Sequence, residues 1–384
     1  MKHVCVAITA RPSYSRVRSA LTAMQADPGI RLSVVCSGSA LLDRYGRVVD
    51  NIRADGFDVV EELYTFVEGG ELVNMAATTA NTISGTAQTL TRLKPDYVVS
   101  IADRYETIGT AIAASYCGFP LVHVQGGEVT GNIDERVRHA VTKLSDLHMV
   151  ANEEAARRVR QLGEHPDTIH VTGCPSLDIV DDAMAGPLSE VQQAVDTQGV
   201  GAHVDLSEPF IVLLQHPETD SHGASYERMC ITLHALDSIG LPVLVFWPNV
   251  DAGSDATSKA IRVVRENGLM TRARYNKNLD GRIFLRLLKE ACCLLGNSSV
   301  GVRECSLMGV PVVNIGDRQI GRARGANVRD TVWDQEVIAT AVREQITHGR
   351  YPADYLYGDG GAGARIARIL SAGPVLTSKR FQDA

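Results

Sequence analysis

Short apolar segments alternate with helix-length segments along most of this chain, and that alternation restricts its fold more than any other feature. Segments rich in valine, isoleucine and leucine are typical of parallel strands, which helices cover on both faces. In the first half they lie at residues 3–9, 31–37, 97–102, 121–125, 147–152 and 169–173. In the second half they lie at residues 210–215, 243–247, 272–275, 292–296 and 312–316. The pattern predicts the α/β class, with doubly wound parallel sheets.

The chain has 384 residues, more than one hydrophobic core usually covers, so we expect two domains. The alternation weakens at residues 181–208, where Gly, Pro, Ser, Gln and acidic residues prevail. We therefore expect an N-terminal α/β domain at 1–180, a polar connector at 181–208 and a C-terminal α/β domain at 209–365. Residues 366–384 are expected to form a helix and tail that can pack across the domains. The ligand cleft should lie between the two domains.

Composition narrows the partners and the compartment. The net charge is −7 and no block of lysines and arginines is present, so neither nucleic acid nor an anionic membrane is an expected partner. The eight cysteines lie mostly in apolar segments without a C-x-x-C pair, which indicates buried thiols in a reduced compartment. No apolar run approaches the roughly 18 residues that span a bilayer, and no signal peptide is recognisable. These features predict a soluble cytoplasmic protein.

Ionisable residues gather in two glycine-bearing loops that follow predicted strands, at residues 100–106 and 123–139. Such loops, at the carboxyl ends of parallel strands, are where open α/β sheets bind ligands and catalyse reactions. A single loop carboxylate is usually just solvated, whereas a cluster with basic residues indicates acid–base chemistry. A metal site at His123, Glu128 and His139 does not fit the usual ligand spacing, and no metal is expected. The cluster consists of Asp103, Arg104, Glu128, Asp134, Arg138 and His139.

Three further features suggest an anion site. The segment Asn297, Ser298 and Ser299 follows an apolar strand and precedes a predicted helix, so it is either a phosphate cradle or a simple helix cap. Arg11 ends the first predicted strand, and its guanidinium could bind a phosphate or be merely exposed. His216 ends the strand at 210–215 and could act as an acid, a base or a phosphate donor, or be structural.

The segment 358–363 matches the pattern G-x-G-x-x-G. A dinucleotide site needs a strand before this pattern and a βαβ unit around it, and neither is predicted here. We interpret the segment as the start of a helix.

The chain resembles UDP-N-acetylglucosamine 2-epimerases, and most closely the hydrolysing branch that forms N-acetylmannosamine. The resemblance extends from the first strand nearly to the C-terminus. It is carried by the motifs at residues 103–104, 126–131, 133–134, 138–140, 142–144, 214–217, 248–254, 296–304, 318–322 and 357–360.

This resemblance implies a glycosyltransferase-B-like fold, with two Rossmann-like domains, an interdomain cleft and UDP in the C-terminal domain. It implies no cofactor, and a homodimer or homotetramer that binds a UDP-sugar. Ser298 and Ser299 would contact the diphosphate and Glu304 the ribose. The residues that would line the nucleotide and phosphate region are Arg11, Ser15, His216, Asn249 and Arg318.

The implied reaction removes the C2 proton and UDP to give 2-acetamidoglucal, after which water adds at C1 and C2 is reprotonated on the other face. By resemblance, Asp103 and Asp134 are the acid–base candidates. The groups that would stabilise charge are Arg104, Arg138, His216 and Arg318.

The sequence departs from the family at two loops. Gln125 stands where many members have a glutamate of the proton-transfer set, and an amide cannot accept a proton at neutral pH. Either Glu128 or another carboxylate replaces it, or the enzyme releases UDP-N-acetylmannosamine instead. Ala40 and Arg44 replace a histidine and an acid of some relatives, so UDP-N,N'-diacetylbacillosamine stays open as the substrate. Arg262 and Arg265 match a feedback site of animal relatives, but we interpret them as arginines of a solvated helix face.

Two other functions fit the same features. A glycosyltransferase would share the fold, and a non-catalytic nucleotide-sugar binder would explain Gln125. Release of UDP without an acceptor separates the first from an epimerase, and turnover of any UDP-hexosamine excludes the second.

Overall fold

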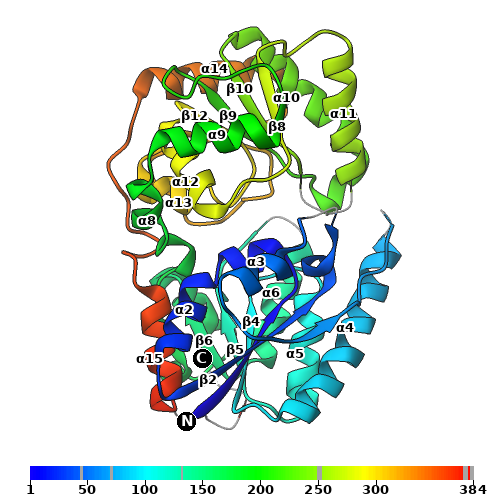
Figure 1. The fold of residues 1–384 in the computed structure, drawn as a ribbon, viewed down its shortest axis with the longest axis vertical. Coiled ribbons are helices and arrows are strands. Elements are labelled where there is room, and N and C mark those ends of the chain that lie inside the picture. Colours follow the sequence, from blue (N-terminus) through cyan, green and yellow to red (C-terminus); the bar gives the residue numbers. More distant parts are fainter. Residues whose placement is uncertain (44–45, 70–71, 131–132, 249–252, 375–378, 381–384) are drawn as a thin grey trace. The chain divides into compact units, whose positions relative to one another are not determined.

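Two seven-stranded sheets organise the chain, which we describe from a computed structural model (Figure 1). The structure describes residues 1–43, 46–69, 72–130, 133–248, 253–374 and 379–380. The chain forms two compact units. Unit 1 comprises Met1–Val129, Ile133–Asp178 and Tyr357–Ala384, and unit 2 consists chiefly of Ile179–Leu356.

The sheet of unit 1 is parallel, with the strand order β3-β2-β1-β4-β5-β6-β7. Its strands are β1 (Lys2–Ile8), β2 (Ile30–Ser37), β3 (Val59–Leu63), β4 (Tyr97–Ile101), β5 (Leu121–Val124), β6 (Leu147–Val150) and β7 (Ile169–Val171). Its helices are α1 (Arg11–Ser15), α2 (Arg18–Ala26), α3 (Val48–Ala54), α4 (Leu72–Leu93), α5 (Thr107–Tyr116), α6 (Ile133–Leu144), α7 (Glu153–Gln161) and α15 (Ala362–Ala372).

Apolar side chains cover both faces of this sheet. One face packs on α2, α3 and α15 around Val6, Leu21 and Ile366, and the other packs on α4, α5 and α6 around Val98 and Ala111. The strand order reverses between β1 and β4, so the loops after these strands diverge there and leave room for a ligand.

The sheet of unit 2 has the order β14-β13-β12-β9-β10-β11-β8 and is parallel except for β8. Its strands are β8 (Gly199–Gly201), β9 (Ile211–Leu214), β10 (Val243–Phe246), β11 (Ala273–Asn276), β12 (Cys293–Gly296), β13 (Val312–Ile315) and β14 (Val328–Thr331). Its helices are α8 (Val180–Ala185), α9 (Leu188–Gln198), α10 (Ser225–Ile239), α11 (Ser254–Glu266), α12 (Gly281–Glu290), α13 (Glu304–Met308) and α14 (Gln335–His348).

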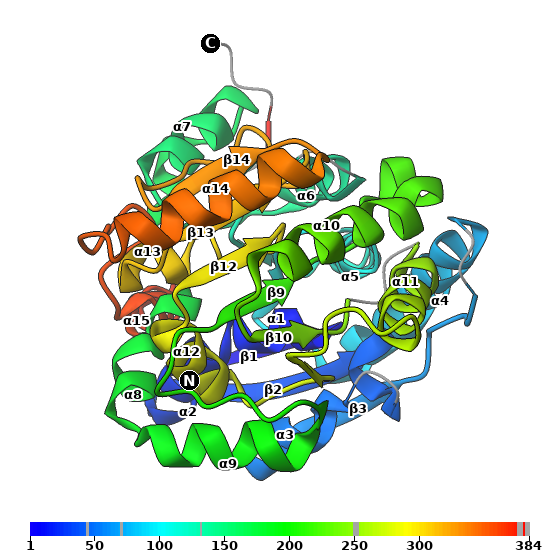
Figure 2. The same ribbon diagram turned by 90° about the horizontal axis from the view of Figure 1, so that it is seen from above.

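Helices again lie on both faces of this sheet. Helices α10, α11 and α14 cover one face, and Figure 2 shows α10 and α14 beside each other. Helices α8, α9, α12 and α13 cover the other. The order reverses between β9 and β12, which places His216 and Ser298 in the two loops that flank the reversal.

All eleven predicted strands are present, and the doubly wound prediction is confirmed. The prediction missed β3, β8 and β14, which lie at sheet edges, where fewer apolar residues are needed. The structure places residues 181–208, expected as a connector, in α8, α9 and β8 of unit 2. This segment folds because Val191 and Val195 of α9 join the core of that unit.

The segment after Leu356 returns to unit 1, where α15 packs on α2. The two helices approach closely because residue 363 is glycine; a Cβ there would lie 2.5 Å from the carbonyl carbon of Ser19. Asp178 accepts hydrogen bonds from the backbone N–H groups of Ala362 (2.9 Å) and Gly363 (2.7 Å). The glycine-rich segment 358–363 therefore starts a helix whose N-terminus is already occupied by a carboxylate of this chain.

Candidate functional site

Asp103 is the second residue after β4 and is almost fully buried. Its carboxylate forms an ion pair with Arg138 of α6, and its Oδ1 lies 3.5 Å from Nη1 of Arg16. Two guanidinium groups favour the ionised form of a carboxyl group. The Asp103 carboxylate is therefore held between the guanidinium groups of Arg16 and Arg138.

Arg138 connects the two ionisable loops of unit 1. It is fully buried, and its Nη1 donates to the backbone carbonyl of Glu128 (2.9 Å) and to Oε2 of Glu135 (3.1 Å). Burial alone would lower the pKa of Arg138, but the charges of Asp103, Glu128 and Asp134 outweigh it and raise that pKa. Arg138 thus stays charged and holds the loop after β4 against the loop after β5.

His123 supports this arrangement from the sheet. Its Nε2 lies 2.8 Å from the carbonyl oxygen of Ala102, so it donates there, and its Nδ1 accepts from the hydroxyl of Thr142 at 3.1 Å. Burial lowers the pKa of His123 to about 3, and the ring is neutral. Because both nitrogens are occupied inside the protein, His123 has a structural role next to Asp103.

The backbone is strained at both strand ends. Ala102 and Gln125, the residues directly after β4 and β5, have φ angles of 59° and 67°. Such left-handed conformations are unfavourable for residues other than glycine, and they concentrate at functional sites. They turn the chain sharply so that Asp103 and the loop at 126–128 follow the strands immediately.

Gln125 is buried, and its side chain points to the loop after β7. Its Nε2 donates to Sγ of Cys174 at 2.8 Å. The same Sγ lies 2.9 Å from Oγ of Ser176. Oε1 of Gln125 is buried without a hydrogen-bond partner among the described residues. The amide is thus held by a thiol, and it offers one buried acceptor to a ligand or to water.

Arg104 forms a second buried ion pair. Its Nε donates to Oε1 of Glu106 at 3.0 Å, and Glu106 is completely buried. Glu106, like Arg16 and Glu135, is a charged site neighbour that the sequence analysis missed. The signal was available for Glu106, because it lies in the same loop as Asp103 and Arg104.

The remaining unit 1 candidates have distinct surroundings. Arg11 begins α1, burial lowers its pKa to about 10, and no hydrogen bond or ion pair reaches its guanidinium from the described residues. An arginine in such a position can bind an anion. Ser15 instead directs its hydroxyl to the carbonyls of Arg11 and Pro12. Asp134 is half-buried in the first turn of α6. His139 lies further along the same helix, and its Nε2 is 2.8 Å from Oε1 of Glu135.

In unit 2, Asn297 links the loops after β9 and β12. Its Oδ1 accepts from the backbone N–H of His216 at 2.8 Å, and its Nδ2 donates to the carbonyl of His216 at 2.9 Å. The carbonyl of Asn297 in turn accepts from Arg318 (3.1 Å) and Gln319 (2.9 Å). Asn297 was expected as part of a phosphate cradle, but its side chain is occupied in fixing His216.

The predicted helix after Ser298 and Ser299 is α13, which starts at Glu304. Residues 299–303 form turns between Ser298 and this helix. The backbone is tightly packed at Gly296, before these serines. A Cβ at Gly296, whose φ is 143°, would lie 2.0 Å from the carbonyl oxygen of Leu214.

Glu304 has one buried oxygen, Oε2, without a hydrogen-bond partner among the described residues. Asn249 and Arg44 lie outside the described residues. Ala40 is buried in the turn after β2. Arg262 and Arg265 are exposed on α11, and the guanidinium of Arg265 lies 5.4 Å from the centre of the Tyr275 ring.

Within the part of the chain that the structure describes, no group of His, Cys, Asp and Glu side chains is placed to hold a metal ion. No described helix is long and apolar enough to cross a membrane.

Two doubly wound units of seven strands each define a glycosyltransferase-B-like fold, and solved structures agree with it. UDP-GlcNAc 2-epimerase from Neisseria meningitidis bound to UDP-GlcNAc matches with a TM-score of 0.80 and 15% identity, over 97% of this chain and 100% of that one. The enzyme from Methanocaldococcus jannaschii in complex with UDP-GlcNAc and UDP matches with a TM-score of 0.79 and 16% identity, with the same coverage.

Sequence comparison identifies the family. The model of the UDP-N-acetylglucosamine 2-epimerase family matches residues 22–371, and the chain belongs to this family of enzymes. It is 29% identical to UDP-N,N'-diacetylbacillosamine 2-epimerase (hydrolyzing) of Legionella pneumophila, over 95% of this chain and 94% of that protein. It is 30% identical to polysialic acid biosynthesis protein P7 of Escherichia coli, over 89% and 85%. The resemblance inferred from the motifs is confirmed at the level of the family.

Proposed function

We propose that this enzyme is a hydrolysing 2-epimerase, which converts UDP-N-acetylglucosamine and water into N-acetylmannosamine and UDP. The observation that carries the proposal is the buried Asp103 carboxylate, which forms ion pairs with Arg16 and Arg138. Its position after β4, next to the order reversal of the sheet, is where this fold class binds ligands. The name of the Legionella relative, a hydrolysing 2-epimerase, supports the hydrolysing type.

In the first step, Asp103 would accept the proton from C2 of the sugar. The C2–H electron pair forms the C1=C2 double bond, while the C1–O bond breaks and its electrons leave on the diphosphate. Arg11 and Arg318, with His216, would stabilise the negative charge on the departing UDP. Ser298 and Ser299 would contact the diphosphate and Glu304 the ribose.

In the second step, the oxygen of water bonds to C1 of the glycal and the water gives one proton to a base, while the C1=C2 electron pair takes up a proton at C2 on the opposite face. This step needs a second acid–base group, and the Gln125 amide cannot supply it. Glu128 and Asp134 are the candidates, because both contribute to the charge around Arg138.

Proton NMR of the enzyme with UDP-N-acetylglucosamine in deuterated water tests the proposal. We expect free N-acetylmannosamine carrying deuterium at C2, together with UDP. A UDP-sugar product would identify the non-hydrolysing type. Product without deuterium would contradict elimination, and no turnover with UDP binding retained would identify a non-catalytic binder.

UDP-N,N'-diacetylbacillosamine is the second candidate substrate, since the name of the Legionella relative specifies it. Measuring kcat/KM for both sugars separates the two. A requirement for an acceptor sugar would instead identify a glycosyltransferase.

We further infer a cytoplasmic homodimer or homotetramer. The cysteines support a reducing compartment, because all eight are free and Cys117 alone among them is exposed. Light scattering of the purified protein measures the assembly.

A further inference from the structure

Glu218 lies two residues after His216 and is largely buried. Its Oε1 accepts hydrogen bonds from the backbone N–H groups of Asp317 (2.8 Å) and Arg318 (3.2 Å), which follow β13. Its Oε2 accepts from Nη1 of Arg228 on α10 at 2.6 Å. The carboxylate of Glu218 therefore connects the loop after β13 to the loop after β9.

The residues around Glu218 leave space for its carboxylate. Gly316 has a φ of 71°, and a Cβ there would lie 2.5 Å from Oε1 of Glu218 and 2.7 Å from the ring of Trp333. The guanidinium of Arg228 lies 5.0 Å from the centre of that ring. The carboxylate of Glu218 thus occupies space that a side chain at Gly316 would fill. The ring of Trp333 lies close enough to the guanidinium of Arg228 for a cation–π contact.

The charge of Glu218 has a consequence for an anion site. An unpaired carboxylate near a diphosphate would repel it, but Arg228 compensates this charge. The two backbone amides bind the carboxylate of Glu218, so they are not themselves ligands for an anion. What Glu218 contributes is the position of the main chain from which Arg318 projects.

Arg318 is also tied to the other loops of unit 2. Its Nη1 donates to the carbonyl of Asn297, whose side chain holds the backbone of His216. A group fixed before binding loses less conformational entropy when the ligand arrives. Glu218 and Asn297 therefore hold His216 and Arg318 in position before a ligand binds.

We propose that Glu218 is a positioning residue that presets Arg318 to bind a nucleoside diphosphate. The inference rests on the proposed function, in which Arg318 contacts the UDP moiety. Glu218 acts through Arg318 and does not touch the ligand.

A double-mutant cycle on UDP affinity tests this role. Isothermal titration calorimetry is done on the full-length protein, on Glu218→Gln, on Arg318→Ala and on the double variant. Glutamine keeps the size of Glu218 but loses the charge that pairs with Arg228, so we expect UDP binding to weaken roughly tenfold. Arg318→Ala should weaken it at least as much, and the double variant should bind no more weakly than Arg318→Ala alone.

Kinetics provide a second readout. We expect Glu218→Gln to raise KM for the UDP-sugar about as much as it weakens UDP binding, with kcat changed less than about threefold. Glu218→Asp, which keeps the charge but is one methylene too short to reach both amides, serves if the glutamine variant does not fold. It should show the same pattern.

Asp334→Ala is the matched control. Asp334 is also a carboxylate that accepts two backbone N–H groups in unit 2, those of Glu336 and Val337 at the start of α14. Its loss should lower stability without changing UDP affinity. Equal weakening of UDP binding by Asp334→Ala would mean that any loss of stability in unit 2 produces the effect, and would overturn the proposal.

The remaining outcomes separate the two inferences. Effects of Glu218→Gln and Arg318→Ala that add in the double variant would refute positioning through Arg318 and leave the proposed function intact. Unchanged UDP affinity in Arg318→Ala alone would contradict the contact that the proposed function assigns to Arg318, and the role of Glu218 with it.

Discussion

Arg16 and Arg138 surround the carboxylate of Asp103, and this pairing determines what replacing the residue should do. Asp103→Asn removes a proton acceptor but keeps the size of the side chain. We expect kcat to fall roughly 10²–10⁴-fold, as is usual when a general base is lost, while UDP still binds. The release of UDP and calorimetric UDP binding measure the two effects.

Glu135→Gln is the control for Asp103→Asn, since Glu135 is another carboxylate partner of Arg138. Its loss should lower kcat far less. Near-normal turnover of Asp103→Asn, or an equal loss in both variants, would show that Asp103 is not the base.

Gln125→Glu tests the departure at residue 125, where many family members have a glutamate. If the missing carboxylate limits the addition of water, the variant should release N-acetylmannosamine faster. The new carboxylate loses the N–H donor to Cys174 and is buried, so we also expect the protein to lose about 1–3 kcal/mol of stability. Hydrolysis and thermal unfolding are measured on the same preparations.

Gln125→Leu separates the two consequences of that change, because it removes the bond to Cys174 without adding an acid. A faster reaction in both variants would assign the effect to the lost bond. Unchanged or slower hydrolysis in Gln125→Glu would indicate that Glu128 or another acid already serves.

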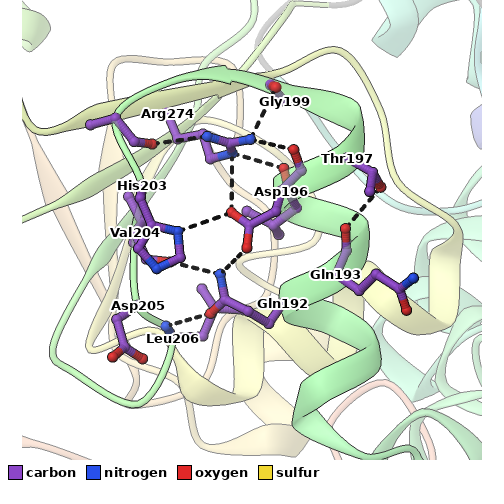
Figure 3. A network of polar contacts seen from close by, with 12 residues as sticks. Gln192, Gln193, Asp196, Thr197, Gly199, His203, Val204, Asp205, Leu206 and Arg274 are labelled. Carbon is purple, nitrogen blue, oxygen red and sulfur yellow. Dashed lines mark hydrogen bonds and ion pairs between the residues drawn. The ribbon is translucent and has the colours of Figure 1, made fainter.

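At the scale of the elements, the position of α9 depends on one arginine of β11 (Figure 3). Arg274 is largely buried and donates to the carbonyls of Val195, Asp196, Gly199 and Ala202, which lie at the end of α9, in β8 and directly after β8. Helix C-termini leave carbonyl groups unpaired, and a cation there also interacts favourably with the helix dipole. Gln192 completes this network through Val204 and Leu206, which fixes the start of the segment that leads to β9.

Arg274→Met should therefore destabilise unit 2 by about 2–4 kcal/mol, because several buried carbonyls lose their donor. Arg274→Lys should recover only part of this, since lysine lacks the planar fork. Both tryptophans, Trp247 and Trp333, belong to unit 2, so their fluorescence during urea unfolding reports on it. A loss below 0.5 kcal/mol, about the size of a surface substitution, would contradict the structural role.

At the scale of the whole molecule, buried histidines make the stability depend on pH. Burial lowers the pKa of His123 to about 3, below its ordinary value of 6.5. The unfolded chain therefore binds a proton more readily, so the stabilisation is complete above pH 6.5 and decreases as the pH falls from there toward 3. For His123 alone we expect about 2 kcal/mol less stability at pH 5 than at pH 7.5.

Hydrogen exchange of the amides in β4 and β5 at several pH values measures this dependence in unit 1. His123→Gln has no titrating ring, and its stability should change less between pH 7.5 and 5. A pH dependence equal to that of the parent protein would assign the effect to other groups, such as His148, whose pKa burial also lowers.

Periodicity along the chain was sufficient to predict eleven strands, two doubly wound sheets and the loops that carry Asp103 and His216. This works because a strand buried on both faces must be apolar along its own length, and because the loops after parallel strands meet at one edge. The family followed from motifs in both halves. The edge strands β3, β8 and β14 were missed because solvent reaches them and no apolar run is required.

The side-chain partners could not be predicted, because they join residues far apart in sequence through three-dimensional packing. Arg138 reaches Asp103 across 35 positions, Gln125 reaches Cys174 across 49, and Glu218 reaches the backbone of Arg318 across 100. Each pairing depends on how strands are ordered in the sheet and how sharply the loops turn, which neither composition nor spacing specifies. The fold class and the family were thus already present in the sequence, whereas the charge state of the site and the positions of its arginines follow from contacts that exist only once the sheets have formed.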